Sequence, residues 1–143
     1  MTTLTRRFFL VLMVMAFAAS ACGALDAKEV ANTAATKVYE QIDAGQLAQI
    51  WTDSDPRFQD AVAKDKFVSL FAFTDPAKGP LGKRSKSDQK GFTSAGADGG
   101  GQLVELSYTS TWANDKTDDS MSFVVKDNVA KLVALNLKAQ TLK

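Results

Sequence analysis

The sequence predicts an α+β fold in which N-terminal helices pack on a curved antiparallel β-sheet. Beyond the leader, apolar residues recur with helical spacing in the first half of the chain and alternate with a period of two in the second half. Pro and Gly cluster at residues 76–82 and 96–101 and mark the division between the two halves. The strands need a cover for their apolar face, and the N-terminal helices are the only elements available to provide it.

The first helix is expected over residues 26–43. Apolar residues recur every four positions from Val30 to Ile42, and the charged residues of this segment lie off that stripe. Ala44-Gly45 follows directly, and a glycine at that position favours the left-handed conformation that ends a helix. The segment therefore predicts an amphipathic helix that ends at Asp43.

Shorter helical segments are expected between this helix and the first Pro and Gly cluster. Residues 46–51 predict a short helix or a turn. Asp55-Pro56 marks a helix start, because Asp55 can cap the helix and Pro56 has a φ angle suited to the first turn. Asp65 starts or continues a further helix. Asp75-Pro76 ends it, because a residue before proline disfavours the helical region.

The second half predicts strands, of which the one ending at Trp112 has the clearest pattern. Val104, Leu106 and Tyr108 lie on one of its faces, opposite Glu105. The Asp127-Asn128 pair predicts a tight turn between the last two strands, so the strands form an antiparallel meander. The expected strands, the first two forming a short polar pair, are residues 82–88, 91–94, 102–112, 120–126 and 129–137.

Residues 1–21 are typical of a signal peptide. Arg6 and Arg7 precede an uncharged apolar stretch at residues 8–19, which is shorter than the roughly 20 residues that a membrane-spanning helix needs. Residues 5–10 also resemble the twin-arginine export motif, whereas the strongly apolar stretch suits general secretion, so the export route stays open. Either route carries the mature chain out of the cytoplasm.

Cys22, the only cysteine, would be the first residue after cleavage. Preceded by Ala19-Ser20-Ala21, it resembles the lipobox cysteine of bacterial lipoproteins, which receives a diacylglycerol; a free thiol in a secreted protein is the alternative. Two acyl chains attach a protein stably to a membrane. By resemblance to the sorting rule of enteric bacteria, the absence of aspartate after Cys22 favours the outer membrane. The expected divisions are a lipoprotein signal peptide (1–21), a lipid-anchor tether (22–28) and one α+β domain (29–140).

The mature domain resembles two known groups of proteins. Its order of elements is similar to the cone-shaped folds of nuclear-transport-factor-2-like and cystatin-like proteins. Over residues 30–138 it more specifically resembles an exported bacterial family catalogued as domain of unknown function 4019. The residues that carry this second resemblance are Trp51, Phe58 within Asp55-Pro56-Arg57-Phe58, Pro80-Leu81-Gly82-Lys83-Arg84 and Thr111-Trp112-Ala113-Asn114. The resemblance implies a curved α+β cone and supplies no reaction.

The charge and composition of the chain exclude several classes of function. Without Arg6 and Arg7, 15 of the 17 basic residues remain against 16 acidic residues, so no net charge attracts nucleic acid. Histidine is absent and Cys22 is assigned to the lipid, which removes the commonest general base and the commonest metal ligands. We therefore expect no enzyme, no cofactor, no metal and no nucleic-acid partner.

The remaining candidates for chemistry are carboxylates. Asp53 and Asp55 form one set, and Asp115, Asp118 and Asp119 form another that is expected in a turn; either can supply oxygen ligands to calcium. Neither set has the spacing of a calcium loop, so solvated turn acids are the favoured interpretation.

Glu105 is the acid inside the clearest strand. In a cone it would be a catalytic base only if it pointed into the cavity, and its phase points it to solvent.

Two sets of side chains are candidates for binding. Aromatic residues are expected mainly in the core, and those chosen as the wall of a pocket or interface are Trp51, Phe58, Tyr108 and Trp112. A basic set on the first polar strands suits an anionic surface, or alternatively protects a sheet edge from aggregation. Its members are Lys83, Arg84, Lys86 and Lys90.

These observations predict a membrane-anchored cell-envelope lipoprotein whose non-catalytic domain binds a protein or another envelope component. The first alternative is a small-molecule-binding domain with an apolar cavity. An isomerase or dehydratase is the weakest candidate, because it requires a buried carboxylate with a raised pKa facing such a cavity.

Overall fold

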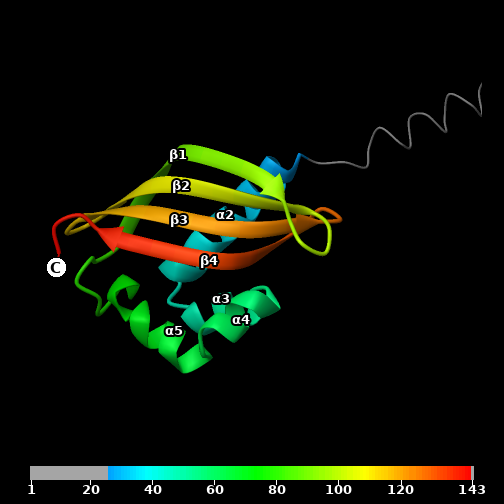
Figure 1. Ribbon diagram of the computed structural model, residues 1–143. Helices are drawn as coiled ribbons and strands as arrows, with labels where there is room; N and C mark the ends of the chain where they lie inside the picture. Colours follow the sequence, from blue (N-terminus) through cyan, green and yellow to red (C-terminus); the bar gives the residue numbers. More distant parts are fainter. Residues whose placement is uncertain (1–25, 143) are drawn as a thin grey trace, which may run out of the picture.

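The structure is a computed structural model that describes residues 26–142 (Figure 1). The expected signal peptide, Cys22 and most of the expected tether lie outside the described residues. Within residues 26–142, no helix is both long and apolar enough to cross a bilayer.

The first described helix, α2 (Ala27–Asp43), confirms the expected helix over residues 26–43. The side chain of Asp26 caps it by accepting a hydrogen bond from the backbone N–H of Lys28 at 3.1 Å. Gly45 follows its end with a φ of 69°, a conformation that glycine adopts without strain.

Three short helices and a 3-10 turn connect α2 to the sheet. They are α3 (Leu47–Asp53), α4 (Pro56–Ala61), α5 (Lys64–Leu70) and η1 (Ala72–Thr74). Asp55 caps α4 as expected, accepting from the N–H of Arg57 at 2.9 Å, and Pro56 occupies the first turn.

Four antiparallel strands form one sheet in the order β1-β2-β3-β4, which confirms the α+β class. They are β1 (Arg84–Gly96), β2 (Gln102–Trp112), β3 (Lys116–Lys126) and β4 (Val129–Ala139). The tight turn expected at Asp127-Asn128 is present, and both residues have positive φ, of 52° and 60°. This geometry matches the twist of a two-residue hairpin.

The expected pair of short strands at residues 82–88 and 91–94 is wrong, because this segment is the single strand β1. The pairing of β1 with β2 shifts register between Gln89 and Gly91. Such an irregularity breaks the alternation of side chains without ending the strand, and in the sequence it resembles a gap between two strands.

The expected start of the third strand at Ser120 is also wrong, because β3 begins at Lys116. Asp118 and Asp119 therefore lie in a strand and not in the expected turn. Asp is depleted in strands, so a sequence pattern undervalues this segment. Asp119 is nevertheless buried on the helix-facing side, where neighbouring side chains hydrogen-bond its carboxylate.

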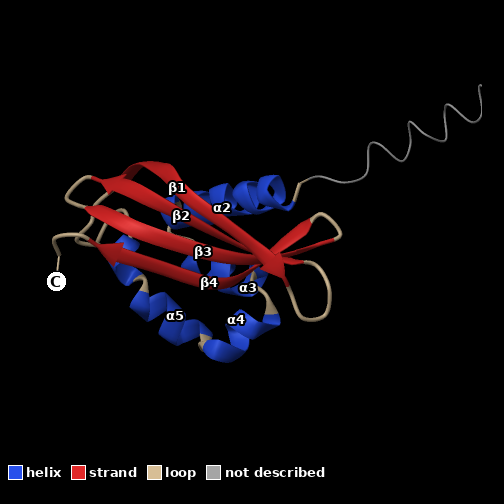
Figure 2. Ribbon diagram, turned by 45° about the horizontal axis from the view of Figure 1, so that its top comes forward, coloured by secondary structure: helices blue, strands red, loops and turns tan. Residues whose placement is uncertain are grey.

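The sheet curves over the helices, which all lie on one of its sides (Figures 1 and 2). α2 packs against its concave face, and α3, α4 and α5 lie below β4. The most deeply buried large side chains fill the space between these layers: Ile42, Ile50, Phe67, Leu81, Leu106, Met121 and Phe123. By strand alternation, the uncovered convex face bears small polar side chains such as Ser107, Thr109 and Ser120.

Candidate functional site

A buried polar cluster joins α2 to the middle of the sheet. The hydroxyl of Tyr39 on α2 donates to Oδ2 of Asp119 on β3 at 2.6 Å. The hydroxyl of Ser110 on β2 donates to the same oxygen. The Asp119 residue is only 3% exposed, so its carboxylate lies in the interior. These three residues form a bridge between three elements that are distant in the sequence.

This cluster extends outward to the surface through Ser87 and Arg84 on β1. Ser87 Oγ lies 2.5 Å from Ser110 Oγ, and Arg84 Nη1 donates to Ser87 Oγ at 3.0 Å. The same guanidinium binds both carboxylate oxygens of Asp43, at 3.0 and 2.5 Å, and lies 4.5 Å from the centroid of the Tyr39 ring. Arg84 thereby fastens the end of α2 to the first strand.

Above this cluster lies a surface pocket of about 290 Å³. Tyr108 contributes to its wall, packs edge-on against Tyr39 at 5.4 Å, and donates to Asn32 Oδ1 at 3.1 Å. The lining residues are Thr36, Tyr39, Glu40, Arg84, Ser87 and Tyr108. Asp119 is not among them, so its carboxylate is separated from the pocket by Tyr39 and the serines.

Burial dominates the electrostatics of the cluster. It raises the pKa of Asp119, while the hydrogen bond from Ser110 opposes the rise. Burial, followed by the charge of Asp119, also raises the pKa of Tyr39. Oδ1 of Asp119 has no hydrogen-bond partner among the described residues. The arrangement fixes α2 on the sheet and presents no proton donor or acceptor to the pocket at the carboxylate itself.

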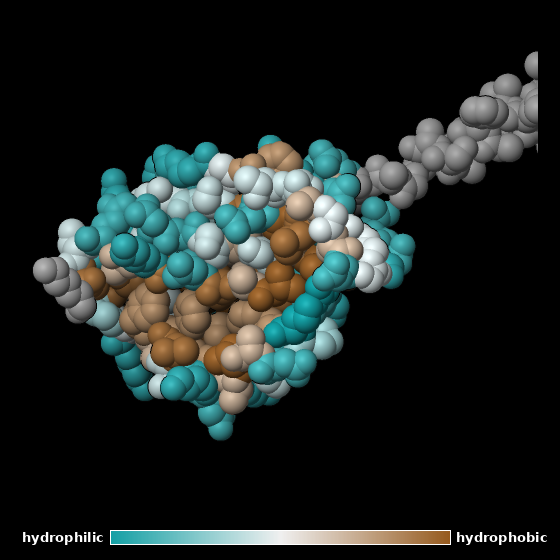
Figure 3. Space-filling model, viewed as in Figure 1, coloured by the Kyte–Doolittle hydropathy of each residue, from teal (hydrophilic) through white to brown (hydrophobic). Residues whose placement is uncertain are grey.

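A second feature is a hollow lined by apolar side chains. Figure 3 shows these side chains gathered along β4 and in the recess between β4 and the α4–α5 segment. β4 forms one edge of the sheet, so no strand lies beyond it in the described chain. The hollow therefore adjoins an open strand edge.

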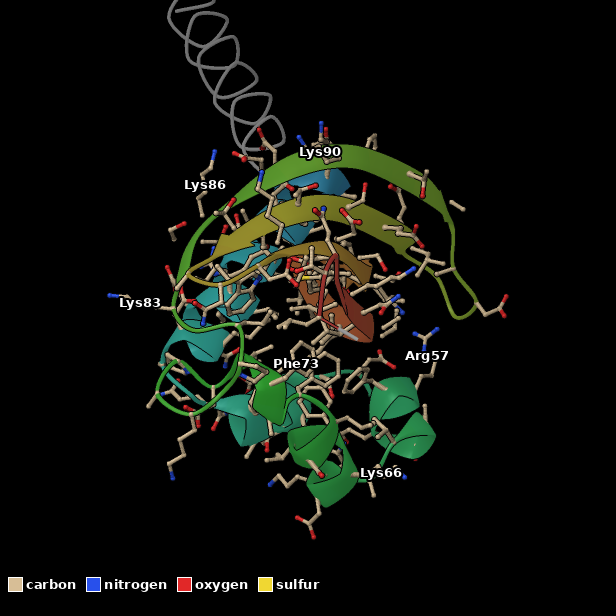
Figure 4. The ribbon with its side chains drawn as sticks, turned by 90° about the vertical axis from the view of Figure 1, so that its left-hand side faces the viewer. Arg57, Lys66, Phe73, Lys83, Lys86 and Lys90 are labelled. Carbon is tan, nitrogen blue, oxygen red and sulfur yellow. The ribbon has the colours of Figure 1, made fainter. Side chains whose placement is uncertain are left out.

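A row of aromatic rings runs from the core towards this hollow. Phe58 and Phe67 are buried, with their ring centroids 5.3 Å apart. Phe71 lies 4.8 Å from Phe67, and Phe73 stacks on Phe71 at 5.9 Å. Phe71 and Phe73 are half-buried, and Figure 4 places Phe73 at the opening between the helices and the sheet. On the other side, β4 contributes the half-buried Leu135.

Residues 34–134 match the family described as protein of unknown function (DUF4019). This match covers more than half of the chain. The chain belongs to the DUF4019 family. Both the buried cluster around Asp119 and the aromatic row fall within the matched residues of this DUF4019 domain. No curated protein matches the chain.

The four aromatic residues predicted as a pocket wall lie in two separate parts of the DUF4019 domain. Trp51 on α3 donates from Nε1 to the carbonyl of Val62 at 2.8 Å, close to the buried Phe58. Tyr108 and Trp112 lie on β2, where the buried Trp112 donates to Thr117 Oγ1 at 2.8 Å. The structure thus does not bring the four into one pocket.

The four basic residues predicted as one patch are likewise divided. Lys83, Lys86 and Lys90 are exposed around β1 (Figure 4), and Lys86 pairs with Asp88 at 2.9 Å. Arg84 instead turns towards Asp43 on α2. The exposed lysines follow the β1 edge, the arrangement that protects a strand edge from pairing with another chain.

The remaining acids of the DUF4019 domain have structural partners or lie at the surface. Asp53 accepts from Gln41, Gln49 and Lys37. Glu105 is exposed, on the face that its phase predicted. In residues 26–142, no three potential metal ligands from His, Cys, Asp and Glu lie close enough to hold an ion.

Sequence reasoning missed two features. Asp119 was assigned to a solvated turn, although its alternation with Met121 and Phe123 is a signal for the inward face of a strand. Phe71 and Phe73 were expected in the core with most other aromatic residues, and no separate role was predicted for them. Their proximity to an open strand edge depends on tertiary packing, which no local pattern reports.

Proposed function

We propose that this chain is an exported, lipid-anchored protein of the cell envelope, and that its DUF4019 domain is a non-catalytic binding domain. It binds an extended, apolar segment of an envelope protein along β4. The observation that carries this proposal is the apolar hollow beside the open edge of β4 (Figure 3).

The two edges of the sheet differ in a way that supports this choice. The β1 edge carries Lys86, Asp88 and Lys90 and two irregularities of register, features that discourage another strand from pairing. β4 reads Val-Ala-Lys-Leu-Val-Ala-Leu-Asn-Leu-Lys-Ala and is largely apolar. An added strand would therefore pair more favourably with β4 than with β1.

If a partner segment added as a strand to β4, backbone hydrogen bonds would provide the affinity, and contacts of its side chains with the hollow would provide the selectivity. The carbonyl of Leu132 already accepts from the N–H of Asp55 at 2.9 Å, so the available edge begins beyond Leu132. Alternate side chains of an added strand would point towards the side of Phe71, Phe73 and Leu135. A partner with apolar residues at every second position fits this surface.

The position of the domain supports the same class of partner. A basic start, a short apolar stretch and Cys22 directly after Ala19-Ser20-Ala21 together favour export and lipidation. The curved sheet with helices on its concave side supports the assignment to the nuclear-transport-factor-2-like cones. Such a tethered domain would meet proteins of the envelope.

Two alternatives are less well supported. The pocket between α2, α3 and the start of β4 has a volume of about 230 Å³, below the roughly 300–1,000 Å³ of ordinary ligand sites. A larger surface hollow of about 560 Å³ is lined mainly by polar side chains such as Lys37, Glu40 and Gln49, so it also disfavours a binder of apolar small molecules. An isomerase needs a carboxylate that faces its substrate. Asp119 is buried with a raised pKa, but it does not line the pocket above it.

Site-specific photocrosslinking in intact cells tests the proposal. A photoreactive amino acid at Phe73 should yield one discrete adduct with another envelope protein. The same amino acid at Thr109, half-buried on the convex face, is the matched control and should yield none.

Equal adducts from both positions, or none from Phe73, would contradict the proposed site. A product with the mass of two copies would show that the occupant is a second copy of this chain. Phe73→Asp should abolish the adduct formed from a photoreactive group at Leu70, which is 54% exposed on α5.

A further inference from the structure

We propose that one end of the domain lies against the lipid bilayer and inserts the side chains of Phe92, Leu103 and Val129 into its interface. This inference rests on the proposed lipid anchor at Cys22. It adds a second contact with the membrane, and it fixes which end of the domain faces the bilayer.

Three segments meet at this end, which we call the hairpin end. They are the start of α2, the β1–β2 loop at residues 97–101 and the β3–β4 turn at Asp127-Asn128 (Figure 1). Lys126 beside the turn donates to the carbonyl of Gly99 in the loop at 3.0 Å, which joins the loop to the turn. Lys28 in the first turn of α2 lies 4.9 Å from the centroid of the Phe92 ring on β1.

The hairpin end concentrates exposed apolar side chains. Phe92 is 45% exposed, Leu103 is 38% exposed and Val129 is 53% exposed. Only two other large hydrophobic residues in the described chain, Leu70 and Leu142, are exposed to this degree. By register, Phe92 pairs with the buried Leu106 and lies on the helix-facing side of the sheet, whereas Leu103 lies on the convex side. Single exposed hydrophobics are common on soluble proteins, but three placed around one end allow that end to enter an apolar interface tip-first.

The short connection to Cys22 brings this end to the membrane. The described residues begin at Asp26, which caps α2, and four residue steps along the sequence separate it from Cys22. Four fully extended residues span at most about 14 Å. A lipid on Cys22 would therefore hold the start of α2 within about 14 Å of that cysteine, and the hairpin end lies beside the start of α2 through the contact of Lys28 with Phe92.

The charges of this end identify the kind of lipid contact. Lys28, Lys126, Lys131 and Arg57 are accompanied by Asp26, Glu29, Asp55, Asp98 and Asp127. Because the acidic residues outnumber the basic ones, attraction to anionic headgroups supplies little of the contact. The chemistry fits the apolar part of the interface, so the contact should form on uncharged lipids and resist salt.

Fluorescence quenching by lipid on the full-length, cell-processed protein tests this inference. Phe92→Trp, Leu103→Trp and Val129→Trp are made singly, and Leu70→Trp is the matched exposed control away from the hairpin end. Each protein is reconstituted in phosphatidylcholine vesicles with or without brominated acyl chains. The native Trp51 and Trp112 provide the same background in every sample.

We expect brominated lipid to remove most of the added emission at positions 92, 103 and 129, to spare position 70, and to act equally at low and high salt. Quenching that is equal at position 70, or absent from all three hairpin-end positions, would overturn the proposed orientation.

Flotation of the vesicles distinguishes the two proposals. If the protein floats with the vesicles but shows no quenching at the hairpin end, the lipid anchor is supported and the proposed orientation is rejected. A chain that does not float lacks the anchor, and both proposals fail.

Discussion

Asp119 links α2, β2 and β3 through hydrogen bonds in the interior of the domain. Its carboxylate receives hydroxyl donors from Tyr39 and Ser110, and Arg84 and Ser87 continue the chain of hydrogen bonds to the surface. A buried carboxylate is tolerated only when such donors replace water. The cluster therefore specifies how α2 sits on the sheet.

Tyr39→Phe should destabilise the domain by about 1–3 kcal/mol, because it removes one of the two hydroxyl donors to Asp119 and leaves the buried carboxylate underpaired. Chemical denaturation measures this change. Tyr108→Phe is the control, since its hydroxyl binds the more exposed Asn32, and it should cost distinctly less. Equal decreases in the free energy of unfolding for the two variants would contradict a specific stabilising role of the Asp119 cluster.

The pH dependence of stability provides an independent test of Asp119. Burial raises its folded-state pKa, so its contribution is complete below the unfolded pKa of about 3.9 and is lost as the pH rises through the folded value. Asp119→Asn cannot ionise. The free energy of unfolding of the parent, relative to this variant, should therefore decrease between about pH 3 and about pH 7. A difference that grows with pH would mean that the carboxylate is stabilised in its charged form.

At the residue scale, sequence reasoning predicted the helix caps and failed at the buried acid. Asp55 caps α4 because a local rule suffices for it. Asp119 depends on Tyr39, which lies 80 positions away in the sequence. No local rule reports such a partner.

The elements themselves followed from periodicity except where the backbone departs from regular geometry. α2, β2 and the Asp127-Asn128 turn lie where the patterns placed them. The sequence pattern predicted two strands in place of β1, because the register shift between Gln89 and Gly91 interrupts the alternation of side chains. The predicted meander implied that β4 lies at an edge of the sheet. The hollow below β4 depends also on the position of α5, which no sequence pattern predicted.

Gly101 before β2 should resist substitution. Its φ is 86°, and an added Cβ would lie 2.5 Å from the carbonyl oxygen of Val125. Gly101→Ala should cost at least about 1–3 kcal/mol, measured by thermal or chemical unfolding. Gly96→Ala is the matched control in the same hairpin, because an added Cβ meets nothing within 4 Å there, and it should be nearly neutral. A neutral Gly101→Ala would contradict the described loop.

Asp115 ties the end of the chain to the β2–β3 connection. The backbone N–H groups of Leu142, Lys116 and Thr141 lower the pKa of its carboxyl to about 2. A lowered folded pKa means that its contribution is present above about pH 4 and is lost as the pH falls towards 2. Asp115→Asn should therefore be less stable than the parent near neutral pH, with the difference vanishing in acid. Asp98→Asn in the β1–β2 loop serves as control and should show no such convergence.

At the scale of the whole molecule, the sequence predicted the class and the layering, while the surfaces that suggest function emerged only with the tertiary structure. The need to cover one face of the meander was enough to place helices on it. The hollow beside β4 is open, and three exposed hydrophobic side chains lie around the end of the sheet where α2 begins. Both proposed contacts, with a partner strand and with lipid, depend on the same anchor.

Intact-mass measurement of the protein purified from its own membranes tests that anchor most directly. We predict a chain that begins at Cys22 and carries the added mass of a diacylglyceryl group, with a further acyl chain if its new N-terminus is acylated. A chain that retains residues 1–21, or one with a free thiol at Cys22, would contradict the account.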